Sequence, residues 1–245
     1  MRNLMASFTA VFWLGCTLPF AMPPATSVSR FVDARWPQGD SQPHGRVTAT
    51  GTSLFFNVVG TDSNQGAISG YQVFTPEASV RVDLGRRYQL APTFSGTLLG
   101  VDAQLVVLRG RLGALGVLHG AGFGVNRSAG LASTSSGGLT VSFHGGLLGQ
   151  VPLGVGTIFL SGRYAYGTGV PFGSSAPGYQ YSGITPMHFI SGNLGFALPL
   201  GSVVCLTPEF AVTWATPAGD LPGSSTLPGA SGLIIAPAIS VGADF

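Results

Sequence analysis

Three observations predict that this chain is all-β and closes into an antiparallel, up-and-down, transmembrane β-barrel. Apolar side chains recur at every second position in many segments, the period of a strand with one face in an apolar environment. The connections between these segments are alternately short and long. Only 8% of the 245 residues are charged, against roughly 25% in an average soluble domain. This composition fits neither a water-soluble surface nor a bundle of membrane helices.

Helices are poor candidates for crossing a membrane in this chain. After the N-terminus, no apolar run reaches the roughly 18 residues that a spanning helix needs. The nearest, residues 112–125, contains five glycines, each of which costs a helix about 1 kcal/mol relative to alanine. In lipid every backbone N–H and C=O must be paired internally, and a closed sheet achieves this without leaving an edge. Strands, rather than helices, are therefore expected to cross the membrane.

The N-terminus is expected to be a signal peptide over residues 1–25, because Arg2 precedes an apolar stretch over residues 4–18. The cleavage site is not defined by the sequence. Cys16 could be lipidated, or it could be discarded with the signal, which would leave Cys205 as a lone thiol. Residues 26–45 are interpreted as a periplasmic lead-in or a short plug, and residues 46–245 as the barrel.

The strands follow in order along the chain. Residues 47–59 and 69–84 contribute one strand each, and further alternating segments bring the count to ten. Closed bacterial barrels have even strand numbers, and eight strands is the alternative, because the register between residues 60 and 96 is the least defined. The turn there is either GRR at residues 85–87 or TPEA at residues 75–78.

The later strands have the clearest turns and loops. The connections VPLG and LPLG, at residues 151–154 and 198–201, are near copies, and RGRLG at residues 109–113 is equally compact. All three have tight-turn chemistry. The intervening connections are long and rich in Gly, Ser, Thr and Pro, and they cover residues 126–137, 167–186 and 216–229. Turns are therefore predicted at one end of the barrel and loops at the other.

Strand faces are assigned by alternation. In residues 203–215, Phe210, Val212 and Trp214 share the outward face, while Glu209 and Thr213 share the inward one. His119 falls on an outward parity. Pro208 and Pro237 fall inside strands where a ladder N–H is needed. Bulges are expected to relieve these positions.

The C-terminal residues carry a resemblance to a known family. Apolar residues occupy every second position before a terminal aromatic, at Ile239, Val241, Ala243 and Phe245. This pattern resembles the C-terminal assembly signal of bacterial outer-membrane β-barrel proteins. The resemblance covers residues 46–245 and implies export to the outer membrane of a Gram-negative cell, with membrane lipid and the barrel-insertion machinery as partners. The oligomeric state is left open.

Aromatic residues are expected to form an interfacial girdle near the loop ends of the strands. Its predicted members are Phe123, Tyr164, Tyr166 and Trp214.

Polar residues on the inward parity are predicted to form a salt-bridged network that fills a narrow lumen, because unpaired charges there would be costly. The predicted members are Arg81, Asp83, Asp102, Gln104, His144, Arg163, Asn193 and Glu209, with Asp244 near the C-terminus. The inward glycines, including Gly116, Gly120, Gly122 and Gly124, either let neighbouring side chains fill the barrel or leave it partly open.

Catalytic and cofactor motifs are missing from the sequence. No G-x-S-x-G elbow occurs, and the four histidines lack metal-ligand spacing. No catalytic residue, metal or cofactor is therefore expected. The 11 basic and 9 acidic residues give a net charge of +2 and are scattered singly, so they form no basic stripe that could bind nucleic acid. A structural or surface-display barrel is favoured, and a narrow, porin-like passive pore or a barrel-embedded hydrolase with His188 at its rim are the alternatives.

Overall fold

The computed structural model describes residues 27–34, 45–59, 69–95, 98–129, 135–172, 186–218 and 231–245. It contains a short 3-10 turn, η1 (Ser29–Phe31), and ten strands. The strands are β1 (Gly45–Val59), β2 (Ser69–Leu84), β3 (Tyr88–Ser95), β4 (Leu98–Gly110), β5 (Gly113–Ala129), β6 (Ser135–Pro152), β7 (Thr157–Phe172), β8 (Met187–Leu200), β9 (Val204–Pro217) and β10 (Ser231–Asp244). The expected signal peptide and Cys16 lie outside the described residues.

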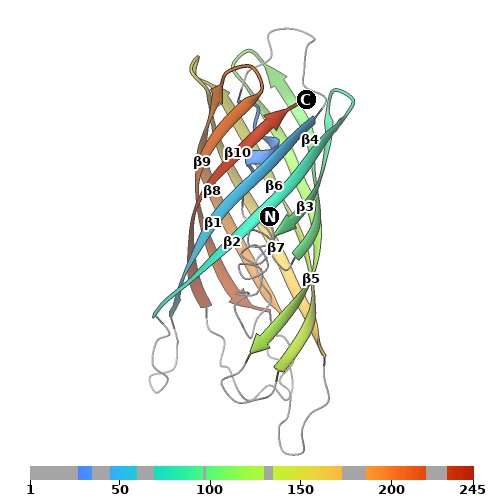
Figure 1. Cartoon of the computed structure of the whole chain (residues 1–245), viewed down its shortest axis with the longest axis vertical. Coiled ribbons are helices and arrows are strands. Elements are labelled where there is room, and N and C mark those ends of the chain that lie inside the picture. The colour runs from blue at the N-terminus through green and yellow to red at the C-terminus, as the bar shows by residue number, and fades with distance from the viewer. Residues whose placement is uncertain are drawn as a thin grey trace, which may run out of the picture.

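Each strand pairs antiparallel with its neighbours in sequence, and β1 pairs with β10 to close the barrel (Figure 1). The prediction of a ten-stranded, up-and-down barrel is confirmed, and the eight-stranded alternative is wrong. TPEA lies inside β2, and the chain turns at residues 85–87 instead. The register between β2 and β3, such as Val82 opposite Leu90, follows from that turn.

Short turns gather at one end of the barrel, which we call the turn end, and the opposite end is the loop end. The turns connect β2 to β3, β4 to β5, β6 to β7 and β8 to β9. Gly154 and Gly201 lie in the two copied turns with φ of 78° and 73°, a left-handed conformation that glycine adopts without steric penalty. Phe245 also lies at the turn end, marked C in Figure 1.

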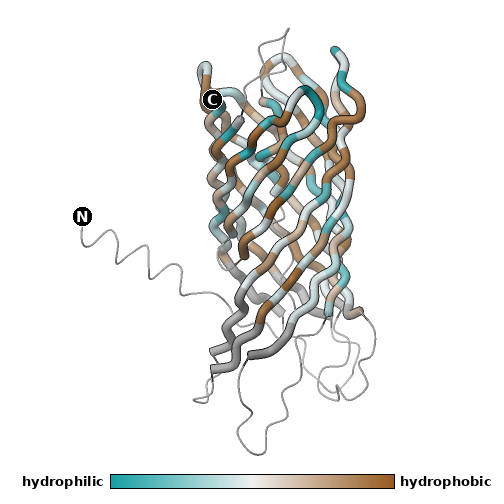
Figure 2. Tube along the Cα trace, turned by 90° about the vertical axis from the view of Figure 1, so that its right-hand side faces the viewer, coloured by the Kyte–Doolittle hydropathy of each residue, from teal (hydrophilic) through white to brown (hydrophobic). Residues whose placement is uncertain are grey.

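The outer face of the barrel is mainly apolar, and the inner face carries the buried polar side chains together with small and some large apolar ones. On β9, Phe210 and Trp214 are exposed while Glu209 and Thr213 are buried. On β10, Ile239 and Val241 are exposed while Ser240 is buried. Figure 2 shows the hydrophobic residues recurring along the tilted strands. The predicted strand faces are therefore confirmed. No helix among the described residues is long and apolar enough to span a membrane.

The prolines inside strands do not produce the expected bulges. The registers on both sides of Pro208 and Pro237 run without a shift, and the ladder instead skips a few pairs there. Loss of a ladder hydrogen bond at a proline is thus absorbed locally, because its neighbours hold the register. The bulges lie elsewhere, at Phe56/Asn57 on β1 and at Val106/Leu108 on β4.

His119 projects from the outer face of β5, as its parity predicts. Its Nε2 lies 3.2 Å from the hydroxyl oxygen of Tyr88. The tyrosine hydroxyl therefore gives the imidazole a hydrogen-bond partner on an otherwise apolar surface, and the strand needs no bulge to accommodate it.

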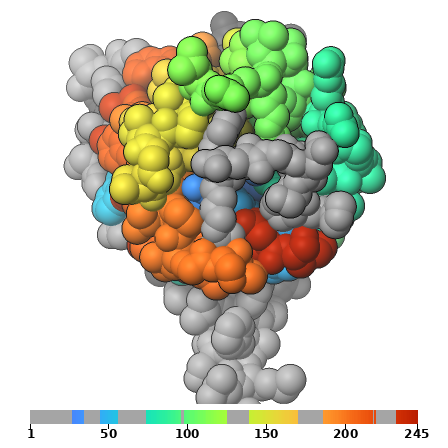
Figure 3. All heavy atoms as spheres, turned by 90° about the horizontal axis from the view of Figure 1, so that it is seen from above, coloured from blue at the N-terminus to red at the C-terminus, as the bar shows by residue number. Residues whose placement is uncertain are grey.

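The lumen is filled rather than open. Toward the loop end, buried apolar side chains from β1 and β7 to β10 form one cluster. It includes Leu54, Phe189 and Ile234. Toward the turn end, residues 27–34 lie inside the barrel and form a second cluster with the inner wall. Figure 3 looks onto this end and shows the blue 27–34 segment at the centre of the ring of strands.

Candidate functional site in the barrel lumen

The segment over residues 27–34 is the core of the lumen site. Val28, Phe31 and Val32 are at most 2% exposed and share an apolar cluster with Leu118 and Phe159 of the wall. Burying such side chains stabilises the seated segment by roughly 1.5–3 kcal/mol each. No described strand pairs with this segment through a β-ladder, so side-chain packing and polar contacts hold it.

Arg30 is the central charge of the segment. Its guanidinium pairs with Glu77 of β2 and with Asp102 of β4, and all three side chains are almost completely buried. A buried cation of this kind is tolerated only when carboxylates compensate it. Arg30 therefore joins the N-terminal segment to two separate strands.

Asp33 is the acidic counterpart of Arg30, toward the turn end. One of its carboxylate oxygens lies 3.2 Å from an Arg81 nitrogen, and the other lies 3.0 Å from an Arg109 nitrogen. Arg81 also pairs with Asp83 at 3.1 Å. The main chain of the segment is held as well, because Gln150 donates to Phe31 O and accepts from Asp33 N, both at 3.0 Å.

Glu209 on β9 receives the start of the segment. The Val28 N–H and the Ser27 hydroxyl both donate to its carboxylate at 3.2 Å. The side-chain amide of Asn193 donates to the same group at 2.9 Å. Hydrogen bonds to a charged acceptor are stronger than neutral ones, so this contact fixes where the segment enters the lumen.

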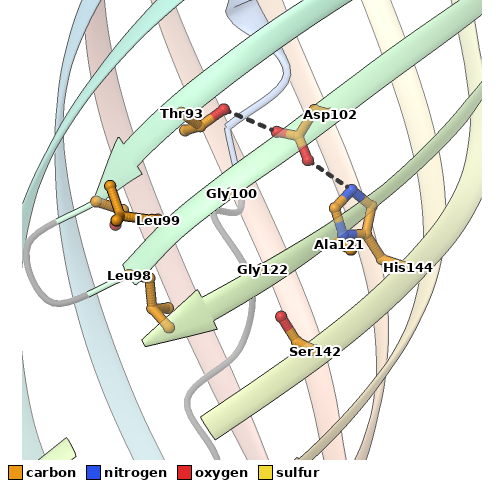
Figure 4. Close-up of a pocket in the computed structure, with 10 residues that line it drawn as sticks. Thr93, Leu98, Leu99, Gly100, Asp102, Ala121, Gly122, Ser142 and His144 are labelled. Atoms are coloured by element: carbon orange, nitrogen blue, oxygen red, sulfur yellow. Dashed lines mark hydrogen bonds and ion pairs between the residues drawn. The ribbon is translucent and has the colours of Figure 1, made fainter. Parts of the chain in front are cut away.

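A second polar group lies between the segment and the loop end. His144 Nε2 of β6 is 2.9 Å from Asp102 Oδ1, and the Thr93 hydroxyl donates to Asp102 Oδ2 at 3.2 Å. A cavity of about 20 Å³ adjoins these groups and is also lined by Ser142, Leu98 and the nearby glycines. Figure 4 shows Ser142 and His144 projecting into this space from β6.

All of the predicted lumen residues face the interior, but the structure brings them together unevenly. Arg81 with Asp83, Asp102 with His144, and Asn193 with Glu209 form direct pairs. Arg163 is buried in the wall of the same lumen. Gln104 is buried against Gly116, and neither atom of its amide has a hydrogen-bond partner among the described residues.

Sequence reasoning missed five charged residues of the network, which are Arg30, Asp33, Arg46, Glu77 and Arg109. Arg30 lies in the segment interpreted as a periplasmic lead-in or a short plug, and the sequence does not show which wall residues it would meet. Glu77 belongs to TPEA, the alternative turn, although it has the inward parity of Arg81. Arg46 lies at the first residues of β1 and pairs with Asp244, Nε to Oδ1, at 2.6 Å. Asp244 had itself been placed inward.

The predicted girdle residues project from the outer face near the loop end. Phe123, Tyr164 and Trp214 are between 44% and 49% exposed. The ring centroid of His188 lies 5.8 Å from that of Tyr164 and 5.4 Å from that of Tyr166. Tyr164 Oη is 2.6 Å from His188 Nδ1. His188 is therefore part of an outer aromatic cluster and not of the lumen.

Metal chemistry has no cluster of ligands in the described strands and segment. No group of three or more His, Cys, Asp or Glu side chains there is arranged to hold a metal ion.

Comparison with known proteins gives structural similarity only. No family model and no curated protein match the chain. Among solved structures it resembles the translocator domain of the autotransporter NalP from Neisseria meningitidis, with 15% identity, a TM-score of 0.48, and coverage of 85% of this chain and 90% of that one. Neisserial surface protein A (NspA) gives 8% identity and a TM-score of 0.32, covering 82% and 97%. The outer membrane protein OprG from Pseudomonas aeruginosa gives 10% identity and a TM-score of 0.37, covering 83% and 96%.

These overlaps are loose, and the barrel is established by the strand pairing of the chain itself. The fold is a closed, ten-stranded, antiparallel, up-and-down β-barrel with an apolar outer face.

Proposed function

We propose that this protein is an integral barrel of the bacterial outer membrane with a structural or surface-display role, and that its lumen is closed to solutes. The apolar outer face supports a lipid environment, because those side chains would otherwise face water. The filling of the lumen carries the proposal. Buried ion pairs hold residues 27–34 in the lumen toward the turn end, and an apolar cluster fills the lumen toward the loop end.

A narrow passive pore is the alternative that this filling disfavours. A pore needs a continuous aqueous path with polar walls, whereas Phe189 and Ile234 are fully buried inside the barrel toward its loop end.

The test is solute uptake by proteoliposomes. Vesicles with the refolded protein should float with it in a density gradient, which shows insertion, yet should not swell in an isotonic solution of a small sugar. Heat modifiability on a gel checks that the barrel is folded. Swelling at a rate comparable to vesicles with an open porin would favour the pore instead, and release of the protein by carbonate would contradict membrane integration.

Assembly by the barrel-insertion machinery is part of the same proposal, with Phe245 as a recognised residue. The Phe245 backbone exchanges hydrogen bonds with Gly45 at 3.1 and 3.2 Å, and its ring is 60% exposed. Phe245→Ser should lower the yield of assembled barrel in cells, whereas Leu112→Ser, at another exposed apolar residue of the turn end, should not. Equal yields would remove Phe245 from the proposal.

A further inference from the structure

The polar group around His144 has a geometry that the closed-barrel role does not use. Two rows of neighbouring residues cross strands β3 to β6 on the inner face. Thr93, Gly100, Gly122 and Ser142 form one row by register, and Ala91, Asp102, Gly120 and His144 form the next. Within one row, side chains on adjacent strands lie close together.

Glycine creates the contact between Asp102 and His144. Gly120 lies between them on β5, and a Cβ there would come within 2.5 Å of Asp102 Oδ1 and 2.6 Å of His144 Nε2. In the other row, Gly100 and Gly122 stand between Thr93 and Ser142 and leave the cavity open (Figure 4). The absence of side chains at these positions therefore produces both an aspartate–histidine pair and a space beside it.

Two polar atoms at this cavity have no partner among the described residues. They are the Ser142 hydroxyl and Nδ1 of His144, and both are buried. With Nε2–H donating to Asp102, a neutral imidazole keeps its lone pair on Nδ1. Ser142 and His144 lie two residues apart on β6, so both project to the same face. A hydroxyl, a free imidazole nitrogen and an orienting carboxylate thus line one cavity.

We propose that Ser142, His144 and Asp102 form an ester-hydrolysing site, with Ser142 as nucleophile, His144 as general base and Asp102 as the residue that positions the imidazole. Separate groups in these roles define nucleophilic acyl transfer. Thr93 donates its hydroxyl to Asp102 Oδ2 at 3.2 Å and thereby helps to hold the carboxylate that positions His144.

The substrate class follows from the surroundings of the cavity. At about 20 Å³ it accepts one small group such as an ester carbonyl, not a whole lipid. The barrel wall is lowest here, because β2 continues past Glu77 to Ser69 and β5 past Gly124 to Ala129, while β3 ends at Ser95. Directly outside lie the exposed side chains Phe94, Leu99 and Phe123, which are register neighbours. An acyl chain on this outer apolar strip would present its ester at the low rim, so the substrate is an acyl ester of an amphiphile.

The reaction balances with water as the only co-reactant. When an ester occupies the cavity, the Ser142 side chain rotates toward His144, and Ser142 Oγ bonds to the carbonyl carbon as its proton passes to His144 Nδ1. The bond between the acyl carbon and the alkoxy oxygen then breaks, and the same proton leaves with the alcohol. Water next attacks the acyl-serine and gives a proton to His144 Nδ1. That proton returns to Ser142 Oγ as the carboxylic acid departs.

The test uses the full chain refolded in detergent, with p-nitrophenyl butyrate as substrate and a fluorophosphonate as covalent probe. The wild type should hydrolyse the ester above the detergent blank, and peptide mapping should place one phosphonyl group on Ser142. Ser142→Ala should lose the label and at least about a hundredfold in rate. Ser161→Ala removes another buried lumen serine without a hydrogen-bond partner among the described residues, and it should leave both readouts unchanged.

Gly100→Ala separates a cavity effect from a folding effect. Its added Cβ would meet nothing nearer than 3.4 Å, so the barrel should keep its heat modifiability. The methyl group would occupy the cavity, and the rate should fall at least about tenfold. A folded wild type that neither reacts with the probe nor exceeds the blank overturns the proposal, as does labelling that persists in Ser142→Ala or full activity in Gly100→Ala.

Discussion

The two ends of the lumen are filled in different ways. At the turn end the filler is a separate stretch of chain, residues 27–34, held by ion pairs from Arg30 and Asp33 to the wall. Toward the loop end the filler consists of side chains of the strands themselves, such as Phe189 and Ile234. The first is held without any ladder hydrogen bond, whereas the second belongs to the hydrogen-bonded strands. One barrel therefore combines closure by a separate segment with closure by its own wall.

The largest effect is expected from Arg30→Ala. This change leaves Glu77 and Asp102 buried without their shared cation, and removing one partner of a buried ion pair costs about 3–5 kcal/mol. The free energy of unfolding, measured by urea titration in detergent, should fall by that amount. Arg30→Lys keeps the charge and should recover part of the loss. A change below about 1 kcal/mol for Arg30→Ala would show that the segment is not held by its charge.

Phe189→Ala should be next, at about 3 kcal/mol. The side chain is fully buried in the cluster toward the loop end, and Phe→Ala changes in packed cores cost about 3–5 kcal/mol. Its outward neighbour Ile190 is 59% exposed, so Ile190→Ala is the matched control and should change the same urea midpoint little. Equal losses of stability in the two variants would contradict the conclusion that inward side chains such as Phe189 fill the lumen toward the loop end.

Phe31→Ala should cost less than Phe189→Ala, at about 2 kcal/mol. Both rings are buried to within 2%, but Phe31 belongs to a segment outside the β-ladders, so we expect relaxation around it to close part of the cavity left behind. The two variants are compared in one titration series. If Phe31→Ala is the more damaging, the N-terminal segment is an integral part of the barrel core and the distinction between the two ends fails.

The smallest effects concern two single hydrogen bonds, each about 1 kcal/mol. Ser29 donates to Ser240 at 2.8 Å at the turn end, and Ser191 and Thr213 share a bond of 2.8 Å between β8 and β9. Ser29→Ala should speed proteolysis of the N-terminal segment in the folded barrel, whereas Ser191→Ala should not. Equal cleavage rates would argue that the segment does not move independently.

Local alternation explains why the wall could be predicted from sequence. Whether Phe210 or Glu209 faces outward depends only on parity within β9, and that prediction holds. Contacts between strands could not be predicted in this way. Asp102 meets His144 only because the registers of β4, β5 and β6 align both with Gly120.

The contacts of the lumen segment could not be predicted from the sequence for a similar reason. The residues around Arg30 do not predict that it will pair with Glu77 and Asp102, because these two carboxylates belong to strands far along the chain. The prediction of bulges at Pro208 and Pro237 was wrong for a related reason. It considered the missing N–H within one strand only, whereas pairing with the neighbouring strands holds the register on both sides.

Arg46 links closure of the barrel to fixation of the segment in its lumen. It lies on β1 opposite Asp244 of β10 and pairs with that carboxylate at 2.6 Å, and it also donates to the carbonyl oxygen of Val32. One side chain thus touches the first strand, the final strand and the lumen segment. Contacts between such distant parts of a chain form late and slowly during folding. Residues 27–34 therefore cannot reach all of their final contacts before β10 pairs with β1, so closure of the barrel and fixation of the segment in its lumen become a single step.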